Sequence, residues 1–165
     1  MLINLNASPF RRDKHEERCE QLAARASENN LPVLYCNLVG GQDELVFDGA
    51  SMAVAADGQV VVQGASFHEA LVPVDISAED SAPVQIAGER LPIPDAEEAV
   101  YEALVLAVRD YVHKNGFRGA LLGLSGGIDS ALTLAIAVDA LGAEAVEAVM
   151  MPFRYTAAMS IEDAE

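Results

Sequence analysis

Residues 119–130 read Gly-Ala-Leu-Leu-Gly-Leu-Ser-Gly-Gly-Ile-Asp-Ser, an apolar run that passes directly into a pair of glycines. The apolar run predicts a short strand over 119–124, and the sequence after the glycines predicts a helix from about Asp129 to Leu141. A third apolar stretch at 145–152 predicts the next strand. Strand, helix and strand in this order form a βαβ unit, which is typical of a parallel sheet covered by helices.

The turn between this strand and this helix has the composition of a phosphate-binding loop. Gly126 and Gly127 allow a sharp turn and a close approach of the backbone to a ligand. Amides at the start of a helix attract anions, and Ser125 and Ser130 add hydroxyl donors. Asp129 would be repelled by bare phosphate, so its presence indicates a bridging Mg²⁺. The alternative is a glycine turn capped by Asp129 without any ligand, and the complete string favours the phosphate loop.

The string Ser-Gly-Gly-Ile-Asp-Ser lacks the Gly-Lys-Ser/Thr of a Walker loop and resembles the pyrophosphate-binding loop of the ATP pyrophosphatase family. Enzymes of that family adenylate an acceptor, release pyrophosphate and let a nitrogen or sulfur nucleophile displace AMP. The resemblance implies that Asp129 holds Mg²⁺ and that eight residues bind ATP. These eight are Gly123, Leu124, Ser125, Gly126, Gly127, Ile128, Asp129 and Ser130.

Stretches on either side of the glycine loop indicate which enzymes with this loop the chain resembles. Residues 151–156, Met-Pro-Phe-Arg-Tyr-Thr, are similar to a strand-end segment of NAD synthetases, although position 153 is commonly small and polar there. Residues 4–10 and 39–51 are similar to the C-terminal part of a nitrilase-like glutaminase domain. A glutaminase followed by this loop is the layout of the glutamine-dependent NAD synthetase family, and the likeness covers nearly the whole chain.

We therefore expect an α/β chain made of two unlike pieces. Residues 1–72 would be the C-terminal part of a nitrilase-like α/β sandwich that acts as the glutaminase domain. Residues 73–94 carry four prolines without lasting periodicity, which predicts a linker or an extended crossing segment. Residues 95–165 would be the N-terminal part of the NAD synthetase domain, with the first βαβ unit of a parallel-sheet ATP pyrophosphatase (adenine nucleotide α-hydrolase-like) fold.

Local patterns predict the other elements of both pieces. A helix over 14–29 ends at Asn29-Asn30, and a second helix from Asp95, its N-cap, ends at Asn115-Gly116. Asp57-Gly58 predicts a hairpin turn. Strands are predicted over 1–7, 32–39, 44–48, 51–56 and 59–64, and the apolar face of the second helix is predicted to comprise Val100, Leu104, Ala107, Val108 and Tyr111.

The resemblance also implies a glutamine site in the first piece. The catalytic Cys, Lys and Glu of the glutaminase would lie upstream of this chain, so no catalytic residue is assigned within it. Ser8 and Lys14 match family positions that contact glutamine. For Lys14, a solvated lysine at the start of a helix is an equally good interpretation.

Other polar and reactive residues are interpreted as structural. Cys36 is expected to be buried within a strand, and Cys19 has no catalytic partner. Arg18 is expected at the surface. The loop residues Gln42, Asp43 and Asp48 are expected to build turns through side-chain hydrogen bonds, and His15, His68 and His113 are assigned surface or packing roles.

The implied reaction is the ATP-dependent amidation of deamido-NAD to NAD. Ammonia released from glutamine would attack an adenylated intermediate, and AMP and pyrophosphate would be released. Taken alone, the chain is expected to be an inactive internal fragment of such a ligase. Two alternatives stay open: another ATP pyrophosphatase with an amidotransferase partner, and a non-catalytic interaction module.

Composition limits the partners of the chain. Its 165 residues are 52% hydrophobic and carry a net charge of −16, whereas nucleic-acid binding needs clustered Lys and Arg. No apolar run reaches the roughly 18 residues of a membrane-spanning helix, and the first residues lack a signal-peptide layout. The sequence thus predicts a cytoplasmic protein that acts on small-molecule substrates and has no nucleic-acid or membrane partner. The resemblance implies that the protein forms a homo-oligomer.

Overall fold

The chain divides into two structural units in the computed structural model, which describes residues 1–78, 84–154 and 158–163. Unit 1 comprises residues 1–40 and 44–103, and unit 2 comprises residues 41–43 and 104–165. The helix that follows the proline-containing segment therefore contributes to both units.

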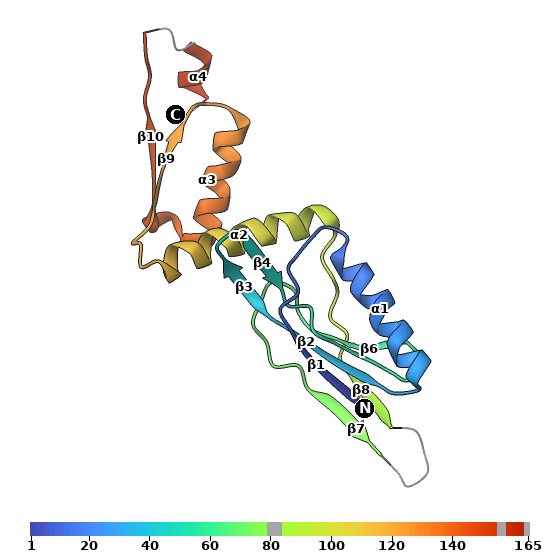
Figure 1. Ribbon diagram of the computed structural model, residues 1–165. Coiled ribbons are helices and arrows are strands. Elements are labelled where there is room, and N and C mark those ends of the chain that lie inside the picture. The colour runs from blue at the N-terminus through green and yellow to red at the C-terminus, as the bar shows by residue number, and fades with distance from the viewer. Residues whose placement is uncertain (79–83, 155–157, 164–165) are drawn as a thin grey trace. The chain divides into compact units, whose positions relative to one another are not determined.

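Unit 1 is built on a mixed four-stranded sheet (Figure 1). Its order is β1-β2-β5-β6, with β1 at Leu2–Asn6, β2 at Val33–Asn37, β5 at Met52–Val54 and β6 at Val60–Gln63. β1 and β2 run parallel, from Leu2 opposite Val33 to Asn6 opposite Asn37, and the other neighbours are antiparallel. The predicted turn at Asp57-Gly58 joins β5 to β6, and Gly58 has a φ of 90°.

Helix α1 (Lys14–Asn29) covers one face of this sheet and ends where the sequence predicted. Asn30 takes the left-handed conformation with a φ of 50°, which closes the helix. Leu22 and Ala26 of the helix pack against strand residues that point to the same face. These strand residues are Val33, Tyr35, Met52 and Val54.

A hairpin of β7 (Val74–Ser77) and β8 (Gln85–Gly88) packs on the sheet as well. Ile86 is buried in a second core cluster with Ala53 and Val62. The sequence predicted a linker or an extended crossing segment here and did not indicate the hairpin. Each strand has only four residues, which is too short for a clear alternation of apolar and polar positions.

The β3–β4 strand pair and helix α2 each contribute residues to both units. β3 (Val39–Gln42) pairs with β4 (Leu45–Asp48), and Asp43 turns the chain between them with a φ of 52°. Helix α2 (Ala96–Lys114) begins as predicted, since Asp95 Oδ1 accepts hydrogen bonds from the N–H groups of Glu97 and Glu98. It ends at Lys114, and Gly116, two residues later, has a φ of 72°.

The buried face of α2 differs from the predicted one. Ala103, Leu106 and Val112 are buried, whereas Val100, Leu104 and Tyr111 of the predicted face remain 38–55% exposed. The helix carries apolar residues on more than one side, so the periodicity alone did not select the face that packs.

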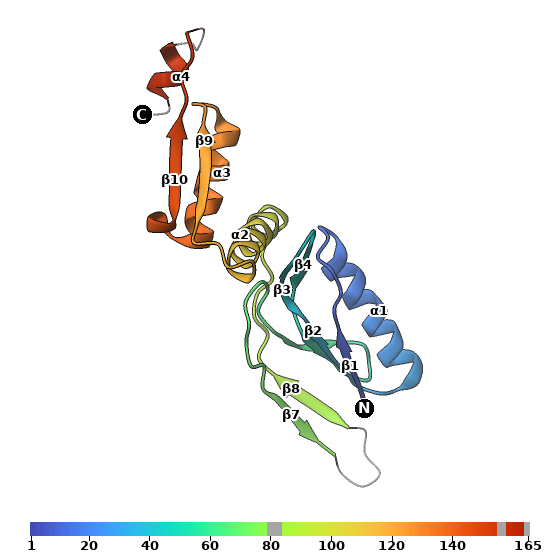
Figure 2. The same ribbon diagram turned by 60° about the vertical axis from the view of Figure 1, so that its left-hand side comes forward.

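Unit 2 contains the predicted βαβ unit. β9 (Ala120–Leu124) and β10 (Val146–Met150) run parallel, with Ala120 opposite Val146, and α3 (Ile128–Leu141) packs on both strands (Figures 1 and 2). A short 3₁₀ helix, η1 (Ala143–Ala145), returns the chain to β10, and α4 (Ala158–Glu162) follows that strand.

The tip of the β3–β4 hairpin is bound within unit 2 by two side chains of α2. Gly41 N–H donates to Asp110 Oδ2 at 2.7 Å, and Lys114 Nζ donates to Gly41 O at 2.6 Å. Lys114 and Asp110 also form an ion pair at 3.0 Å. Burial raises the pKa of Asp110, but the Gly41 N–H and Lys114 outweigh it, so the pKa lies below its ordinary value.

We expect Asp110→Asn to lower the melting temperature of the full-length protein at neutral pH and to have no effect in strong acid. A carboxyl group whose pKa is lower in the folded state stabilises the fold above its unfolded pKa of about 4, and the stabilisation disappears as the pH falls through the folded pKa. Calorimetry of both proteins from pH 7 to pH 3 measures the difference. Glu144→Gln, an exposed residue of unit 2, is the control, and a difference that does not vary with pH would contradict this account.

Candidate functional site

The glycine loop lies at one edge of the parallel strands. Residues 125–127 join the end of β9 at Leu124 to the start of α3 at Ile128. Because β10 runs parallel to β9, its last residue, Met150, reaches the same edge opposite Leu124. Open α/β sheets bind their ligands at this carboxyl edge.

Two serine hydroxyls brace the loop. Ser130 Oγ donates to Gly127 O at 2.8 Å and accepts from the N–H of Ser125 at 3.2 Å. Ser125 Oγ lies 3.0 Å from Ser130 Oγ and accepts from the N–H of Gly127 at 3.3 Å. Hydrogen bonds of its own serine side chains thus fix the conformation of the loop.

Glycine is required at position 126 by both conformation and space. Gly126 has a φ of 77°, and a Cβ atom there would lie 2.2 Å from the carbonyl oxygen of Ser160. A cavity of about 270 Å³ adjoins the loop and is lined by residues from both strand ends and from α4. The lining residues are Gly123, Leu124, Ser125, Met150, Met151, Pro152 and Ser160.

Asp129 lies exposed in the first turn of α3. Among the residues that the structure describes, no three His, Cys, Asp or Glu side chains gather into a metal-binding group. This fits Mg²⁺ in its common mode, in which one or two carboxylates and the phosphates of a substrate hold the ion.

A second cavity, of about 380 Å³, belongs to unit 1 and is called the Ser8 cavity here. Ser8 and Lys14, the two residues matched to glutamine-binding positions, both line it, together with Arg18 and Tyr35. Ser8 follows β1, and Lys14 opens α1 with its Nζ 3.0 Å from Oε1 of Glu17. The structure therefore brings the two residues to one cavity.

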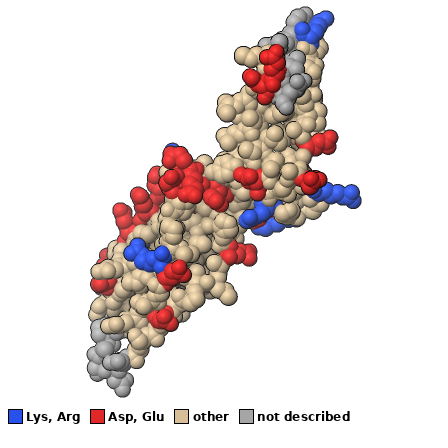
Figure 3. Space-filling model, turned by 180° about the vertical axis from the view of Figure 1, so that it is seen from behind, with Lys and Arg blue, Asp and Glu red and all other residues tan. Residues whose placement is uncertain are grey.

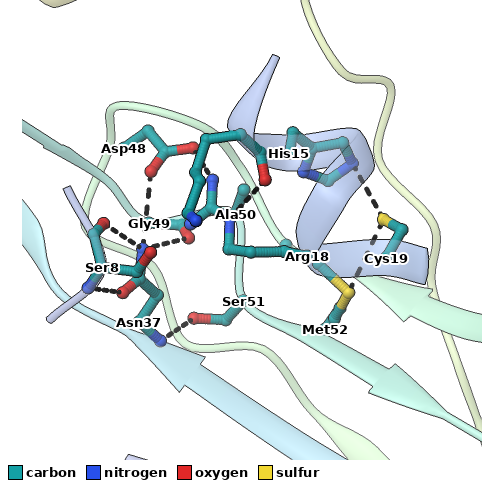
Figure 4. A network of polar contacts seen from close by, with 12 residues as sticks. Ser8, His15, Arg18, Cys19, Asn37, Asp48, Gly49, Ala50, Ser51 and Met52 are labelled. Carbon is teal, nitrogen blue, oxygen red and sulfur yellow. Dashed lines mark hydrogen bonds and ion pairs between the residues drawn. The ribbon is translucent and has the colours of Figure 1, made fainter. Parts of the chain in front are cut away.

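Arg18, which lines this cavity, belongs to a buried polar network (Figure 4). Arg18 forms an ion pair with Asp48, and each of the two side chains is 5% exposed. Burial lowers the pKa of Arg18, but the hydrogen bond and charge of Asp48 outweigh it and raise that pKa above its ordinary value. Asn37, also buried, accepts from the N–H of Ser8 at 2.8 Å.

Two sequence-based expectations are wrong at this network. Arg18 is buried rather than at the surface, because it pairs with a carboxylate 30 residues away in the chain. Asp48 forms that buried ion pair rather than a turn, whereas Asp43 and Gln42 do contact each other at the turn, at 3.2 Å. Asn37 was not singled out, although a polar residue inside the apolar run at 32–39 was a signal.

The cysteines differ in their surroundings. Cys36 is exposed, not buried as expected, because Tyr35 and Asn37 beside it point into the core and alternate residues of a strand point to opposite faces. Cys19 is half-buried, with its Sγ 3.4 Å from His15 Nε2, and burial raises the pKa of its thiol.

Acidic side chains are widespread on the face shown in Figure 3, in line with the net charge of −16. No helix among the described residues has the length and apolar character needed to cross a membrane.

Comparisons with known proteins match both parts of the chain. A family model for carbon–nitrogen hydrolases matches residues 1–85, and one for NAD synthases matches residues 100–165. Glutamine-dependent NAD(+) synthetase from Acinetobacter baylyi is 48% identical over 99% of this chain, and the one from Thermotoga maritima is 38% identical over the whole chain. The chain spans only 30% and 34% of their lengths.

Solved structures agree with these matches. A glutamine-dependent NAD+ synthetase from Acinetobacter baumannii, solved with adenosine diphosphate, superposes with a TM-score of 0.86 at 44% identity over 98% of this chain and 31% of that one. The enzyme from Cytophaga hutchinsonii, 18% identical with a TM-score of 0.73 over 98% of this chain and 33% of that one, shows the same fold.

Proposed function

This chain belongs to the carbon–nitrogen hydrolase family and continues into an NAD synthase segment, and we propose that it is the junction segment of a glutamine-dependent NAD synthetase. Such a ligase amidates deamido-NAD to NAD with ATP and with ammonia taken from glutamine. The two family matches in one chain, in this order, are the observation that supports the proposal most strongly.

The loop at 123–130 is proposed to bind the phosphates of ATP. Its hydrogen-bonded serines, the left-handed Gly126 and the main-chain amides at the start of α3 suit an anionic ligand. The role of ATP is to adenylate the carboxylate of deamido-NAD, because a carboxylate becomes a good electrophile only with a leaving group such as AMP. Asp129 would hold Mg²⁺, which when bound offsets the charge of the phosphates.

The Ser8 cavity is proposed to receive the α-substituents of glutamine. Ser8 offers a hydroxyl and Lys14 an ammonium group at the cavity wall. The nucleophilic Cys and its Lys and Glu partners would come from a part of the enzyme outside this chain, so the fragment alone is expected to be inactive. The cytoplasmic location and the homo-oligomeric state inferred from the sequence remain predictions.

Product analysis tests the synthetase half. A full-length synthetase that carries this segment should convert ATP to AMP and pyrophosphate when given deamido-NAD and ammonia, with one NAD formed per AMP. Formation of ADP and phosphate instead would contradict the proposal. It would favour a different ATP-dependent enzyme.

We expect Ser8→Ala to raise the KM for glutamine in this full-length synthetase and to leave ammonia-dependent synthesis near normal. Ser8 lies in unit 1 and lines the Ser8 cavity, so losing its hydroxyl affects one nitrogen donor only. One lost hydrogen bond predicts a rise of about tenfold. Steady-state kinetics with both donors measure this, and an equal loss with glutamine and ammonia would indicate a folding role.

A further inference from the structure

The side chain of Asn37 binds both main-chain polar groups of Ser8 (Figure 4). The N–H of Ser8 donates to Asn37 Oδ1 at 2.8 Å, and Asn37 Nδ2 donates to Ser8 O at 3.3 Å. A donor and an acceptor presented together in this way imitate the edge of a neighbouring strand.

This imitation occurs where the true strand pairing stops. The ladder between β1 and β2 ends with Asn6 opposite Asn37, and the last bond runs from Leu38 N–H to Asn6 O at 3.0 Å. Pro9 has no N–H with which to continue a ladder. The amide of Asn37 therefore fixes the chain after β1 ends.

Hydrogen bonds to two further acceptors hold the Asn37 side chain in one orientation. Its Nδ2 reaches Gly49 O at 3.1 Å and Asp48 Oδ1 at 3.4 Å, both of which are acceptors. A flipped amide would turn Oδ1 toward these oxygens and lose the bonds. The main-chain N–H of Asn37 donates to Ser51 Oγ at 3.0 Å, and the Asn37 residue is only 6% exposed.

Since Ser8 lines the Ser8 cavity, whatever holds Ser8 sets the place of its hydroxyl in that cavity. We propose that Asn37 is a positioning residue for glutamine binding: it orients Ser8 through the two main-chain bonds, and Arg18 and Asp48 support it from the core. This inference rests on the proposed function, because it needs the Ser8 cavity to receive glutamine. Asn37 itself does not line that cavity and is not expected to touch the substrate.

Two substitutions at position 37 test this role in the full-length synthetase. Asn37→Asp keeps the acceptor for Ser8 N–H, removes the Nδ2 donor and sets a second carboxylate beside Asp48. Asn37→Ala removes both bonds to Ser8. We expect each to raise the glutamine KM by about tenfold, with Asn37→Ala at least as large, and to leave ammonia-dependent synthesis within twofold of normal.

A double-mutant cycle with Ser8→Ala separates positioning from general damage. If Asn37 acts through Ser8, then Asn37→Asp should add less than about twofold to the glutamine KM once the Ser8 hydroxyl is gone. Asn29→Asp is the matched control, because Asn29 is exposed and its side chain donates to Arg25 O within its own helix. Multiplicative effects, or equal losses with both nitrogen donors, would overturn the proposal.

One further measurement keeps the proposal testable if the variants do not fold. The main-chain amide of Ser8 should exchange slowly with solvent deuterium in the unmodified enzyme, because it donates a hydrogen bond to Asn37 Oδ1. Rapid exchange would contradict the proposed role of Asn37. Failure of the proposed function would give a different experimental result from failure of this inference. In that case the unmodified enzyme forms no NAD from glutamine, whereas failure of this inference leaves that activity intact and the Asn37 variants unchanged.

Discussion

Asp129→Asn in a full-length synthetase that carries this segment should reduce the rate of NAD formation from ammonia by at least about 100-fold. Asp129 is the exposed carboxylate in the first turn of α3, directly after the glycine loop. Mutation of a residue that only hydrogen-bonds to a metal ligand typically lowers metal affinity or activity by about 10- to 100-fold. The loss of a direct ligand should therefore lower the rate by at least the upper value. Asparagine keeps the size of the side chain and removes only its charge.

The Mg²⁺ requirement gives the diagnostic measurement for this variant. Initial rates at increasing Mg²⁺ should show a higher half-saturating concentration for Asp129→Asn than for the unmodified enzyme. Glu144→Gln removes a carboxylate from the same unit at an exposed position and should change neither value. An unchanged rate and an unchanged Mg²⁺ requirement for Asp129→Asn would show that the phosphate loop works without this residue.

Asp48→Ala should destabilise unit 1 by about 3–5 kcal/mol. It leaves the Arg18 guanidinium buried without its counter-charge, and it removes one of the groups that hold Asn37. Removing one partner of a buried ion pair lowers the stability of the fold more than removing both partners. The double variant Arg18→Met with Asp48→Ala should therefore be more stable than Asp48→Ala alone.

Amide hydrogen exchange measures this effect within the full-length protein. Peptides from β2 and β5 should lose protection in Asp48→Ala, while peptides from α3 in unit 2 serve as an internal reference. Arg25→Ala is the control for an ion pair, because Arg25 and Glu28 are 73% and 58% exposed and their pairing should contribute little. Equal protection in Asp48→Ala and Arg25→Ala would show that the buried pair does not stabilise the unit.

Local signals in the sequence were sufficient for most elements of the fold. The bounds of α1 follow from its periodicity and from Asn30, which closes the helix in the left-handed conformation. The βαβ unit around the glycine loop follows from three apolar runs with glycines between the first two, and α2 begins at the predicted Asp95 cap. Each of these signals involves residues that are close together in the chain.

The β7–β8 hairpin was missed because its strands are short, whereas the misses at Arg18, Asn37 and Cys36 depend on contacts between residues that are far apart in the chain. Arg18 lies on a helix rich in charges, and nothing near it in the sequence indicates a buried carboxylate at Asp48. Asn37 and Ser8 are separated by 29 positions, so their mutual hydrogen bonds could not be predicted without the strand register. Cys36 was placed in the correct strand, and its exposure depends on which face of the sheet α1 covers.

This segment is proposed to join a glutamine-hydrolysing part to an NAD-forming part of one enzyme. Glutamine labelled with ¹⁵N at its side-chain amide tests this most directly. When a full-length synthetase that carries this segment is given the labelled glutamine, ATP and deamido-NAD, the label should appear in the amide of NAD, with AMP and glutamate formed in equal amounts. Glutamate release without ¹⁵N in NAD, or no NAD from glutamine at all, would contradict the account.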